Sequence, residues 1–237
     1  MKNTLPDTVR FLAADSVFSG LDGAAISGIA SHCRERSRKP GQDLFLEGDP
    51  CRDLYILVSG RVKCFRASSE GREQILRVFE RPGDTFCTTS AFSTGSHIVS
   101  AQAMTEVRVY VIDVDTIKRV VLDHPVLAMA LMTATGDQMR SLVTLADDLS
   151  LKTATARVAK LLAERGRAEG RGKPVRLRRA DLREEQIAAL VGTVRVHVSR
   201  SLKALATMGA ITLERDTIRI NDLNALEAFL HAVGPER

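Results

Sequence analysis

Cationic and hydroxyl side chains line one side of an amphipathic segment, Val194–Leu205, near the C-terminal end of the chain. Its apolar residues recur at helical spacing and define a stripe suited to packing: Val194, Val198, Leu202 and Leu205. The side chains that this spacing turns away from the stripe are Arg195, Ser199, Arg200 and Lys203. Guanidinium, ammonium and hydroxyl groups bind the phosphate oxygens and base edges of DNA. The segment is typical of a DNA recognition helix, and the alternative is a packing helix with a solvated cationic face.

A second amphipathic pattern directly precedes this segment and ends at a glycine. Ile187, Leu190 and Val191 share one helical face, and Gly192 follows where the chain must turn sharply with a positive φ. Two short helices joined in this way form a helix-turn-helix, whose second helix enters the major groove. We therefore predict that double-stranded DNA is contacted by Thr193, Arg195, Val196, His197, Ser199, Arg200 and Lys203.

The residues after the recognition segment alternate as a β-hairpin does. Ile211 and Leu213 are expected to face Ile218 and Ile220 across a turn at residues 215–216. A helix-turn-helix followed by a small hairpin predicts a winged helix, an arrangement that plain packing units seldom have.

Charge is distributed unevenly along the 237 residues, whose formal net charge is +5. From Ser150 to the end there are 17 Lys and Arg against 10 Asp and Glu, whereas the rest of the chain has 17 against 19. Basic charge concentrated beside the helix-turn-helix favours binding to the phosphate backbone. The N-terminal residues lack the apolar run of a signal peptide and no window approaches a membrane span, so we expect a cytoplasmic protein with no membrane partner.

The N-terminal half is predicted to contain a compact antiparallel barrel or jelly roll. Between residues 42 and 113, short alternating apolar runs are separated by glycines at the corners, namely Gly48, Gly60, Gly71 and Gly83. One or two short helices are expected between residues 15 and 36, and another near residues 116–122. The four cysteines lack the spacing of a zinc ribbon and are expected to be free thiols: Cys33, Cys51, Cys64 and Cys87.

A long helix is expected from Pro125, because proline suits the first turn of a helix. Apolar residues along it recur at steps of three and four, which is the a/d pattern of a coiled coil. We therefore predict a homodimer whose interface contains Leu131, Gln138, Leu142, Leu145 and Leu149. A helix that faces the core of a monomer would show a similar stripe.

These elements predict an α+β chain in three parts. Residues 1–123 form an effector or sensor β-barrel with flanking helices, residues 124–149 a dimerisation helix, and residues 150–237 a winged helix-turn-helix. No nucleophile, base and orienting group occur at a recognisable spacing, and there is no glycine-rich phosphate loop, so an enzyme is not expected. The alternative is a nucleotide-binding regulatory module that does not bind DNA, and the cationic recognition face argues against it.

With its elements in this order, the chain resembles the CRP/FNR family of bacterial transcription regulators along nearly its whole length. The segments that carry the resemblance are FSGL at Phe18–Leu21, LFLEGD at Leu44–Asp49, LYILVSGRVK at Leu54–Lys63, PGD at Pro82–Asp84 and GTVRVHVSRSLKAL at Gly192–Leu205. The resemblance implies a cyclic-nucleotide-binding-type barrel, a homodimer through the long helix, and paired recognition helices that read a palindrome in successive major grooves. It also implies RNA polymerase as a partner.

The recognition segment departs from the family at one position. Members commonly carry a glutamate followed, after two residues, by serine or glycine and then arginine. Ser199 and Arg200 match the end of that motif, and Val196 stands in place of the glutamate. Valine offers only apolar contact, for instance to a thymine methyl group, where glutamate accepts a hydrogen bond from cytosine. We therefore expect a half-site that differs from the usual one.

The barrel departs further from the family members that bind cyclic AMP. Counting from the Pro-Gly-Asp segment puts Cys87 and Thr88 at the positions of the Gly-Glu pair, and Ile98 and Val99 at those of the Arg-Ser pair. Burying a cyclic phosphate against these side chains without a cation would be strongly unfavourable. We expect these four residues to line a pocket for an effector other than a cyclic nucleotide, and the alternative is a module for which cyclic AMP is the effector.

Three other kinds of sensing chemistry depend on cysteine or histidine. No cysteine precedes Cys33, so the N-terminal iron–sulfur cluster of the oxygen-sensing members is not expected. Haem is conceivable, with His32, His97 or Cys87 as its ligand, and a surface or packed side chain is the alternative for each. Thiol oxidation is a further alternative at Cys51, which follows a Gly-Asp-Pro turn and is expected to be exposed.

Overall fold

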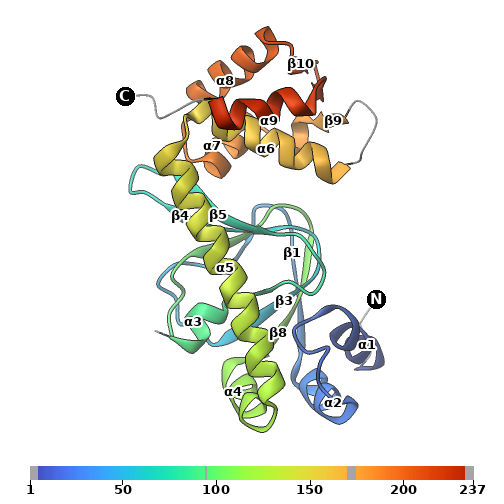
Figure 1. Ribbon diagram of the computed structural model, residues 1–237. Helices are drawn as coiled ribbons and strands as arrows, with labels where there is room; N and C mark the ends of the chain where they lie inside the picture. Colours follow the sequence, from blue (N-terminus) through green and yellow to red (C-terminus); the bar gives the residue numbers. More distant parts are fainter. Residues whose placement is uncertain (1–4, 94, 170–174, 233–237) are drawn as a thin grey trace. The chain divides into compact units, whose positions relative to one another are not determined.

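The computed structural model describes residues 5–93, 95–169 and 175–232, and the chain forms two compact units (Figure 1). The first comprises the residues up to Arg66 together with Leu76–Ser141, and the second comprises Ala67–Ile75 together with the residues from Leu142 onward. The division therefore falls inside the long helix, several residues before the boundary expected near residue 150. Each unit has its own hydrophobic core.

Two four-stranded antiparallel sheets make up most of the first unit, with strand orders β1-β8-β3-β6 and β2-β7-β4-β5. The strands are β1 (Arg34–Arg38), β2 (Asp43–Phe45), β3 (Asp53–Ser59), β4 (Val62–Ala67), β5 (Glu73–Phe79), β6 (Thr85–Phe86), β7 (Ser100–Ala103) and β8 (Val107–Asp113). Two packed sheets of this kind are the jelly roll expected from the alternating runs. The corner between β3 and β4 requires Gly60, because its φ is +93° and a Cβ there would lie 2.2 Å from Glu106 O.

The sequence did not predict the first strand of the roll. All five residues of β1 are polar, so the segment shows no alternation of apolar and polar residues. The strand is defined by its pairing with β8, in which Arg36 lies opposite Val109. A charged edge strand of this kind is a common way to keep a sheet from pairing with another molecule.

Helices flank the sheets in the described part of the first unit: α1 (Leu5–Asp15), α2 (Gly23–His32), α3 (Thr88–Phe92) and α4 (Val114–Asp123). Aspartates cap two of them, because Asp22 Oδ1 accepts from the Ala25 amide at 2.8 Å and Asp113 Oδ1 accepts from the Asp115 amide at 2.9 Å. The helices α2 and α4 were expected from the sequence. In contrast, α1 precedes the segment in which helices were predicted.

The long helix α5 (Pro125–Leu151) begins at the predicted proline and is 27 residues long. Leu127 and Leu131 are only 1% and 5% exposed and belong to the core of the first unit. Gln138 Nε2 donates to Thr85 O at 3.2 Å, again within that unit. Leu131 and Gln138 therefore face their own chain, which differs from the prediction that they meet a partner chain.

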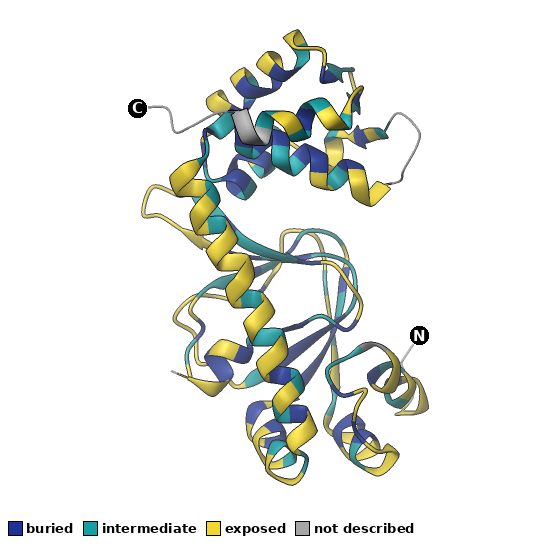
Figure 2. Ribbon diagram, viewed as in Figure 1, coloured by how far each residue is buried: buried dark blue, intermediate teal, exposed yellow. Residues whose placement is uncertain are grey.

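The exposed side of α5 bears a second stripe with the same period (Figure 2). Met129, Met132 and Met139 are 61%, 66% and 63% exposed, and the exposed Gly136 lies between the last two at heptad spacing. Val143, which is 54% exposed, continues the stripe. Steps of three and four residues thus occur on two sides of the helix, and the sequence pattern alone does not tell which side faces the core.

The second unit is a winged helix-turn-helix, as predicted. Its helices are α6 (Ala154–Glu169), α7 (Glu184–Val191), α8 (Arg195–Thr207) and α9 (Leu223–Ala232), and its antiparallel sheet has the order β10-β11-β9. The stripe Val198, Leu202 and Leu205 of α8 is at most 2% exposed, which confirms the pattern. Val194, however, is 42% exposed because it caps α8 from outside the helix, so its assignment to the buried stripe was wrong.

The wing has the predicted register. Ile211 of β10 (Ile211–Leu213) lies opposite Ile220 of β11 (Thr217–Ile220), and Leu213 lies opposite Ile218. A third strand, β9 (Val175–Arg178), pairs with β11 and was not predicted. Two of its four residues are arginines, so the segment lacks the apolar alternation that predicts a strand.

Candidate functional site

The turn between α7 and α8 is fixed by a glycine in the left-handed conformation. Gly192 has φ +69°, and the amide of Thr193 donates to Ala188 O at 3.0 Å, which closes the end of α7. A Cβ on Gly192 would lie 2.3 Å from Leu149 Cδ2 and 2.6 Å from Gln74 Oε1. Both backbone conformation and space therefore select glycine, as the sequence predicted.

The guanidinium of Arg157 in α6 binds the same turn, a role that the sequence did not predict. Its Nε donates to Val191 O at 2.6 Å and its Nη2 to Gly192 O at 3.3 Å. Its Nη1 donates to Lys152 O at 2.6 Å, at the C-terminal end of α5. One guanidinium thus satisfies carbonyl groups that the ends of two helices leave without intrahelical partners. Burial lowers the pKa of Arg157 without removing its charge.

The exposed face of α8 contains most of the predicted DNA-contacting side chains. Val196 is 58% exposed, and Arg195, His197, Arg200 and Lys203 are exposed as well, whereas Ser199 is half-buried. Thr193 is not on this face, because it is only 7% exposed and its Oγ1 lies 3.3 Å from His197 Nδ1. The Thr193 side chain therefore positions the His197 ring.

The cations on this face differ in their partners. Arg195 Nε lies 3.2 Å from Glu184 Oε2 and 3.3 Å from Glu185 Oε1, so Arg195 is paired with two carboxylates of α7. Within the described residues, Arg200 and Lys203 have no carboxylate partner. These two side chains are the ones on α8 whose charge is free to neutralise a phosphate or to reach a guanine.

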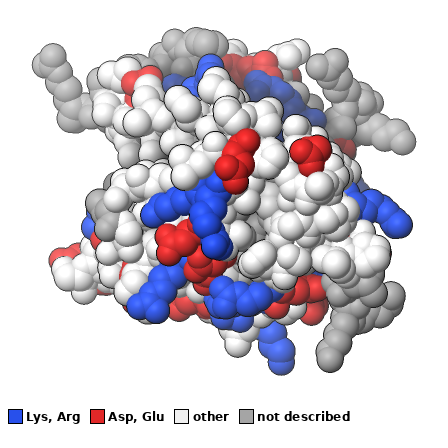
Figure 3. All heavy atoms as spheres, turned by 90° about the horizontal axis from the view of Figure 1, so that it is seen from below, with Lys and Arg blue, Asp and Glu red and all other residues white. Residues whose placement is uncertain are grey.

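Several basic residues beside the wing are paired with carboxylates within the second unit. Arg176 Nε and Arg219 Nε lie 3.7 and 3.6 Å from the Glu214 carboxylate, and Arg178 Nε lies 3.9 Å from Asp181 Oδ2. Figure 3 shows another face, seen from below relative to Figure 1, on which basic and acidic side chains are intermixed.

Of the four predicted effector-pocket residues, Thr88 lines a cavity, whereas Cys87 and Val99 pack against the core of the roll. Thr88 is 1% exposed and lines a cavity of about 460 Å³ with Thr89, Phe92, Val121, Ala128, Leu131, Met132 and Thr135. Thr135 Oγ1 lies 3.5 Å from Thr88 Oγ1, a contact that links α5 to the start of α3. Ile98, by contrast, is 47% exposed, and Val99 packs against the core of the roll. Among the residues that the structure describes, those lining the cavity are uncharged and cannot neutralise a cyclic phosphate.

The interior of the roll is filled by its own rings. Phe45 stacks on His97 with a centroid distance of 3.8 Å and an interplanar angle of 11°, and Tyr55 stacks on Phe86 at 5.3 Å. His97 is 4% exposed, and burial lowers its pKa, which keeps the imidazole neutral near pH 7. Burial likewise raises the pKa of Tyr55 to about 12. This packing leaves His97 as part of the core.

Two of the four cysteines, Cys51 and Cys87, pack together beside this aromatic cluster. Cys51 is buried, at 6% exposed, so the prediction that it is exposed was wrong. It shares a small cluster with Cys87, Ala91 and Val114. Cys87 Sγ also lies 3.6 Å from His97 Nδ1. Burial raises the pKa of Cys33 and Cys64 to about 12, so those two thiols are protonated at neutral pH.

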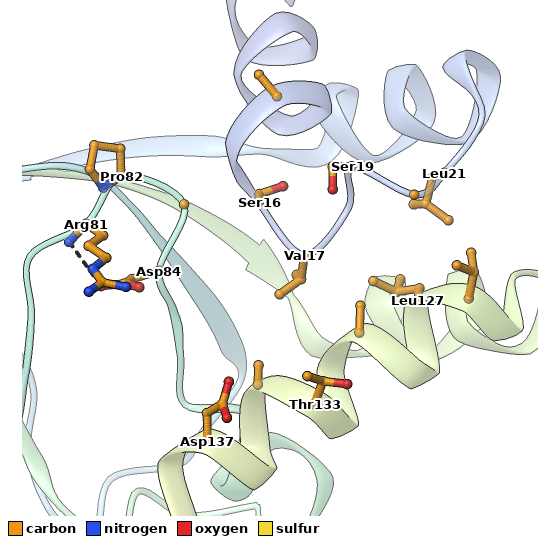
Figure 4. A pocket seen from close by; sticks show the side chains of 16 residues that line it. Ser16, Val17, Ser19, Leu21, Arg81, Pro82, Asp84, Leu127, Thr133 and Asp137 are labelled. Carbon is orange, nitrogen blue, oxygen red and sulfur yellow. Dashed lines mark hydrogen bonds between the residues drawn. The ribbon is translucent and has the colours of Figure 1, made fainter. Parts of the chain in front are cut away.

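A second cavity, of about 600 Å³, lies between the α1–α2 connection, the Arg81–Asp84 loop and α5 (Figure 4). Figure 4 shows Ser16 and Ser19 on one side and Asp137 of α5 on another. The Arg81 amide donates to Asp84 Oδ2 at 3.0 Å, which fixes the loop. The charged side chains that line this cavity are Arg81, Asp84 and Asp137, so carboxylates outnumber cations there.

The residues that the structure describes offer neither a metal site nor a membrane-spanning helix. They contain no group of three or more His, Cys, Asp or Glu placed to hold a metal ion. Nor does any described helix combine the length and apolar character that crossing a membrane requires.

Comparison with known proteins finds two domain families in the chain. Residues 35–124 match the cyclic nucleotide-binding domain family, and residues 156–229 match the Crp-like helix-turn-helix domain family. The chain is 32% identical over 218 residues to the CRP-like cAMP-activated global transcriptional regulator of Mycobacterium tuberculosis, covering 92% of this chain and 97% of that protein. It is 29% identical over 211 residues to the cyclic AMP receptor protein of Thermus thermophilus, covering 89% and 94%.

A solved structure shares the fold. The c-di-GMP-responsive regulator CLP of Xanthomonas campestris has a TM-score of 0.75 at 21% identity, covering 85% of this chain and all of that chain. Together with the helix-turn-helix geometry and the jelly roll, these matches make the chain a CRP-like transcription regulator with a DNA-binding domain and a cyclic-nucleotide-binding-type domain, and not an enzyme. The chain belongs to the CRP/FNR family of transcription regulators.

Proposed function

We propose that the protein is a homodimeric, sequence-specific transcription regulator that reads a palindromic DNA site with α8 and receives a signal other than a cyclic nucleotide through its jelly roll. The observation that supports this most strongly is the exposed face of α8, where Arg200 and Lys203 have no acidic partner among the described residues, on a helix fixed by Gly192 and Arg157. A protein with this function acts in the cytoplasm and works on RNA polymerase, the partner that family membership suggests.

Arg200 and Val196 are the side chains that we assign to base readout. They are exposed one helical turn apart, so both face the same groove. Arg200 can donate two hydrogen bonds to guanine, and Val196 contacts a thymine methyl group. Lys203, a turn further on, is assigned to a phosphate. The paired Arg195 would have to exchange its carboxylate partners for phosphate on binding.

The dimer interface is assigned to the exposed stripe of α5 rather than to the core-facing one. Met129, Met132, Gly136, Met139 and Val143 follow a heptad spacing along it. Burying such methionines against a second copy of the helix stabilises association by roughly 1.5–3 kcal/mol per side chain. Two identical α5 helices packed in this way place the α8 helices as a symmetric pair, which matches a palindrome.

The effector is proposed to differ from the one in the names of the two curated relatives. The described residues that line the cavity beside Thr88 and Thr135 include no Lys or Arg, and Ile98, at a position predicted for the phosphate clamp, is exposed. The cavity is also lined without His or Cys, so its residues do not fit haem iron. A cyclic-AMP response is the competing assignment. Isothermal titration calorimetry decides between them, because micromolar binding of cyclic AMP would contradict the proposal.

Selection from random duplex DNA tests the function itself. We expect enrichment of a palindrome whose half-sites are about one helical turn, roughly 34–36 Å, apart. Each subunit contributes phosphate contacts, so the logarithm of the association constant should fall steeply and linearly with the logarithm of the salt concentration. Recovery of no sequence preference, at any salt concentration at which the protein stays dimeric, would contradict the proposal.

A further inference from the structure

Two thiols and an imidazole meet where the roll joins α3. Cys51 precedes β3, Cys87 lies immediately before α3, and His97 precedes β7, so three separate segments converge. Cys51 and Cys87 pack in one small cluster, and Cys87 Sγ lies 3.6 Å from His97 Nδ1. Packing alone does not require two sulfur atoms and a buried ring nitrogen in one place.

The backbone at Cys87 argues further against a passive role. Its φ is +72°, which makes it the sole non-glycine residue with a positive φ among the described parts of the chain. That conformation favours glycine, and a residue with a Cβ is retained there at a backbone cost. A cysteine kept at such a position is explained if its sulfur has chemistry to perform.

We propose that Cys51 and Cys87 form a disulfide when a hydroperoxide reaches this cluster, so that the first unit is a thiol-based peroxide sensor. The regulatory consequence rests on the DNA-binding function proposed above, whereas the disulfide itself does not. All four cysteines are free thiols in this structure, which corresponds to the reduced state of the sensor.

The surroundings assign different roles to the two sulfurs. A hydrogen bond with the Cys87 thiol lowers the pKa of Cys51 overall, against the opposing effects of burial and of the Asp53 carboxylate. Burial raises the pKa of Cys87 well above its usual range, and the neighbouring Cys51 raises it further. Cys51 is therefore the nucleophile that attacks peroxide, and Cys87 is the resolving thiol.

The reaction balances with the peroxide as the only oxidant. The Cys51 thiolate attacks one peroxide oxygen, the O–O bond breaks, and the leaving oxygen departs as water or an alcohol after taking a proton. Cys87 passes its proton to the neutral imidazole of His97 and attacks the sulfur of the Cys51 sulfenic acid. The S–S bond forms, the S–O bond breaks, and hydroxide leaves as water on taking the proton from His97. Two thiols lose two electrons, and one peroxide gains them.

Within the first unit, Cys87 is connected to α5, the helix assigned to the proposed dimer interface. Thr88 directly follows Cys87, and its Oγ1 lies 3.5 Å from Oγ1 of Thr135, which donates its proton to Leu131 O within α5. Pulling Cys87 toward Cys51 must therefore move the residue that contacts α5 next to the exposed stripe. Closing the disulfide would shift the population of DNA-competent dimers by altering this contact.

The experiment uses the full chain, reduced and freed of reductant, then treated with one equivalent of hydrogen peroxide per protomer. We expect an intact mass lower by about 2 Da and a nonreduced peptide that links Cys51 to Cys87. With Cys87→Ser, Cys51 should stop at the sulfenic acid and be trapped by dimedone, whereas Cys51→Ser should lose the reaction. Cys33→Ser removes a thiol outside the cluster and should react like the wild type.

Dimedone labelling of Cys87 in the Cys51→Ser variant, or a linkage other than Cys51–Cys87, would overturn the assignment. The DNA selected with reduced protein then serves as the probe, and oxidation should change its Kd at least tenfold in the wild type but not in Cys87→Ser. A disulfide that forms without changing the Kd would overturn the coupling. If the reduced protein binds no DNA although the disulfide forms, the proposed function fails and the thiol chemistry stands.

Discussion

Replacing Arg157 by methionine should loosen the helix-turn-helix while leaving the aliphatic part of its packing in place. The two short hydrogen bonds, 2.6 Å each to Val191 O and Lys152 O, involve a charged donor and contribute about 1.5–2 kcal/mol apiece. The bonds of 3.3 and 3.4 Å to Gly192 O and Asp148 O add little. The cost of burying the guanidinium opposes these gains, so we expect a net loss of about 2–3 kcal/mol.

Urea unfolding followed by circular dichroism measures this loss, and hydrogen exchange localises it. A loss of 2–3 kcal/mol corresponds to roughly 30- to 150-fold faster exchange of the core amides of α7 and α8. The matched control is Arg167→Met in the same helix, whose exposed pair with Glu227, at 2.7 Å, should be worth less than about 1 kcal/mol. Equal effects of the two substitutions, or a change below about 0.5 kcal/mol for Arg157→Met, would refute the reasoning.

Three further predictions concern other elements. Met132→Lys should convert the proposed dimer to monomers in sedimentation analysis, because two like charges would meet where the two α5 helices pack together. Met208→Lys, which changes a comparably exposed methionine outside α5, should leave the dimer intact. A Met132→Lys variant that stays dimeric would contradict the proposed interface. Asp148 is half-buried, which raises its pKa, but hydrogen bonds from Lys152 and Lys160 lower the pKa below 3.8 overall. The stability that ionised Asp148 adds to the folded protein is therefore complete above its unfolded-state pKa and is lost as the pH falls through its folded-state pKa. As the pH is lowered from about 5 to about 2, the urea midpoint should fall less steeply for Asp148→Asn than for the wild type. An equally steep fall in both proteins would count against the pairing. Val196→Glu should shift the selected half-site toward cytosine at one position by about 1–3 kcal/mol, and an unchanged consensus in the repeated selection would remove Val196 from the readout.

The sequence predicted the helix-turn-helix because its determinants are local. Gly192 is needed for a positive φ between two short apolar stripes, and the hairpin register follows from alternation of Ile211 with Leu213 and of Ile218 with Ile220. Local pattern and tertiary fold agree at these positions, so the structure confirms them.

What the sequence did not predict depends on contacts between distant segments. Two apolar stripes of equal period run along α5, and only the packing of Leu131 against the first unit shows which one remains exposed. Arg157 has no motif, since it binds main-chain carbonyls rather than side chains. Cys51 and Cys87 are 36 residues apart in the chain, and their proximity follows from the closure of the roll rather than from spacing.

Replacing Arg200 shows whether the exposed face of α8 reads DNA. The measurement is the Kd of the full chain for its selected palindrome and for variants of each base pair, with Arg200→Ala compared with Arg10→Ala, which removes an exposed arginine from α1. We predict a loss of about 1–3 kcal/mol per affected half-site and a loss of base preference at one position in each half-site for Arg200→Ala, with little change for Arg10→Ala. Full affinity and unchanged preference at every position in Arg200→Ala would contradict the account.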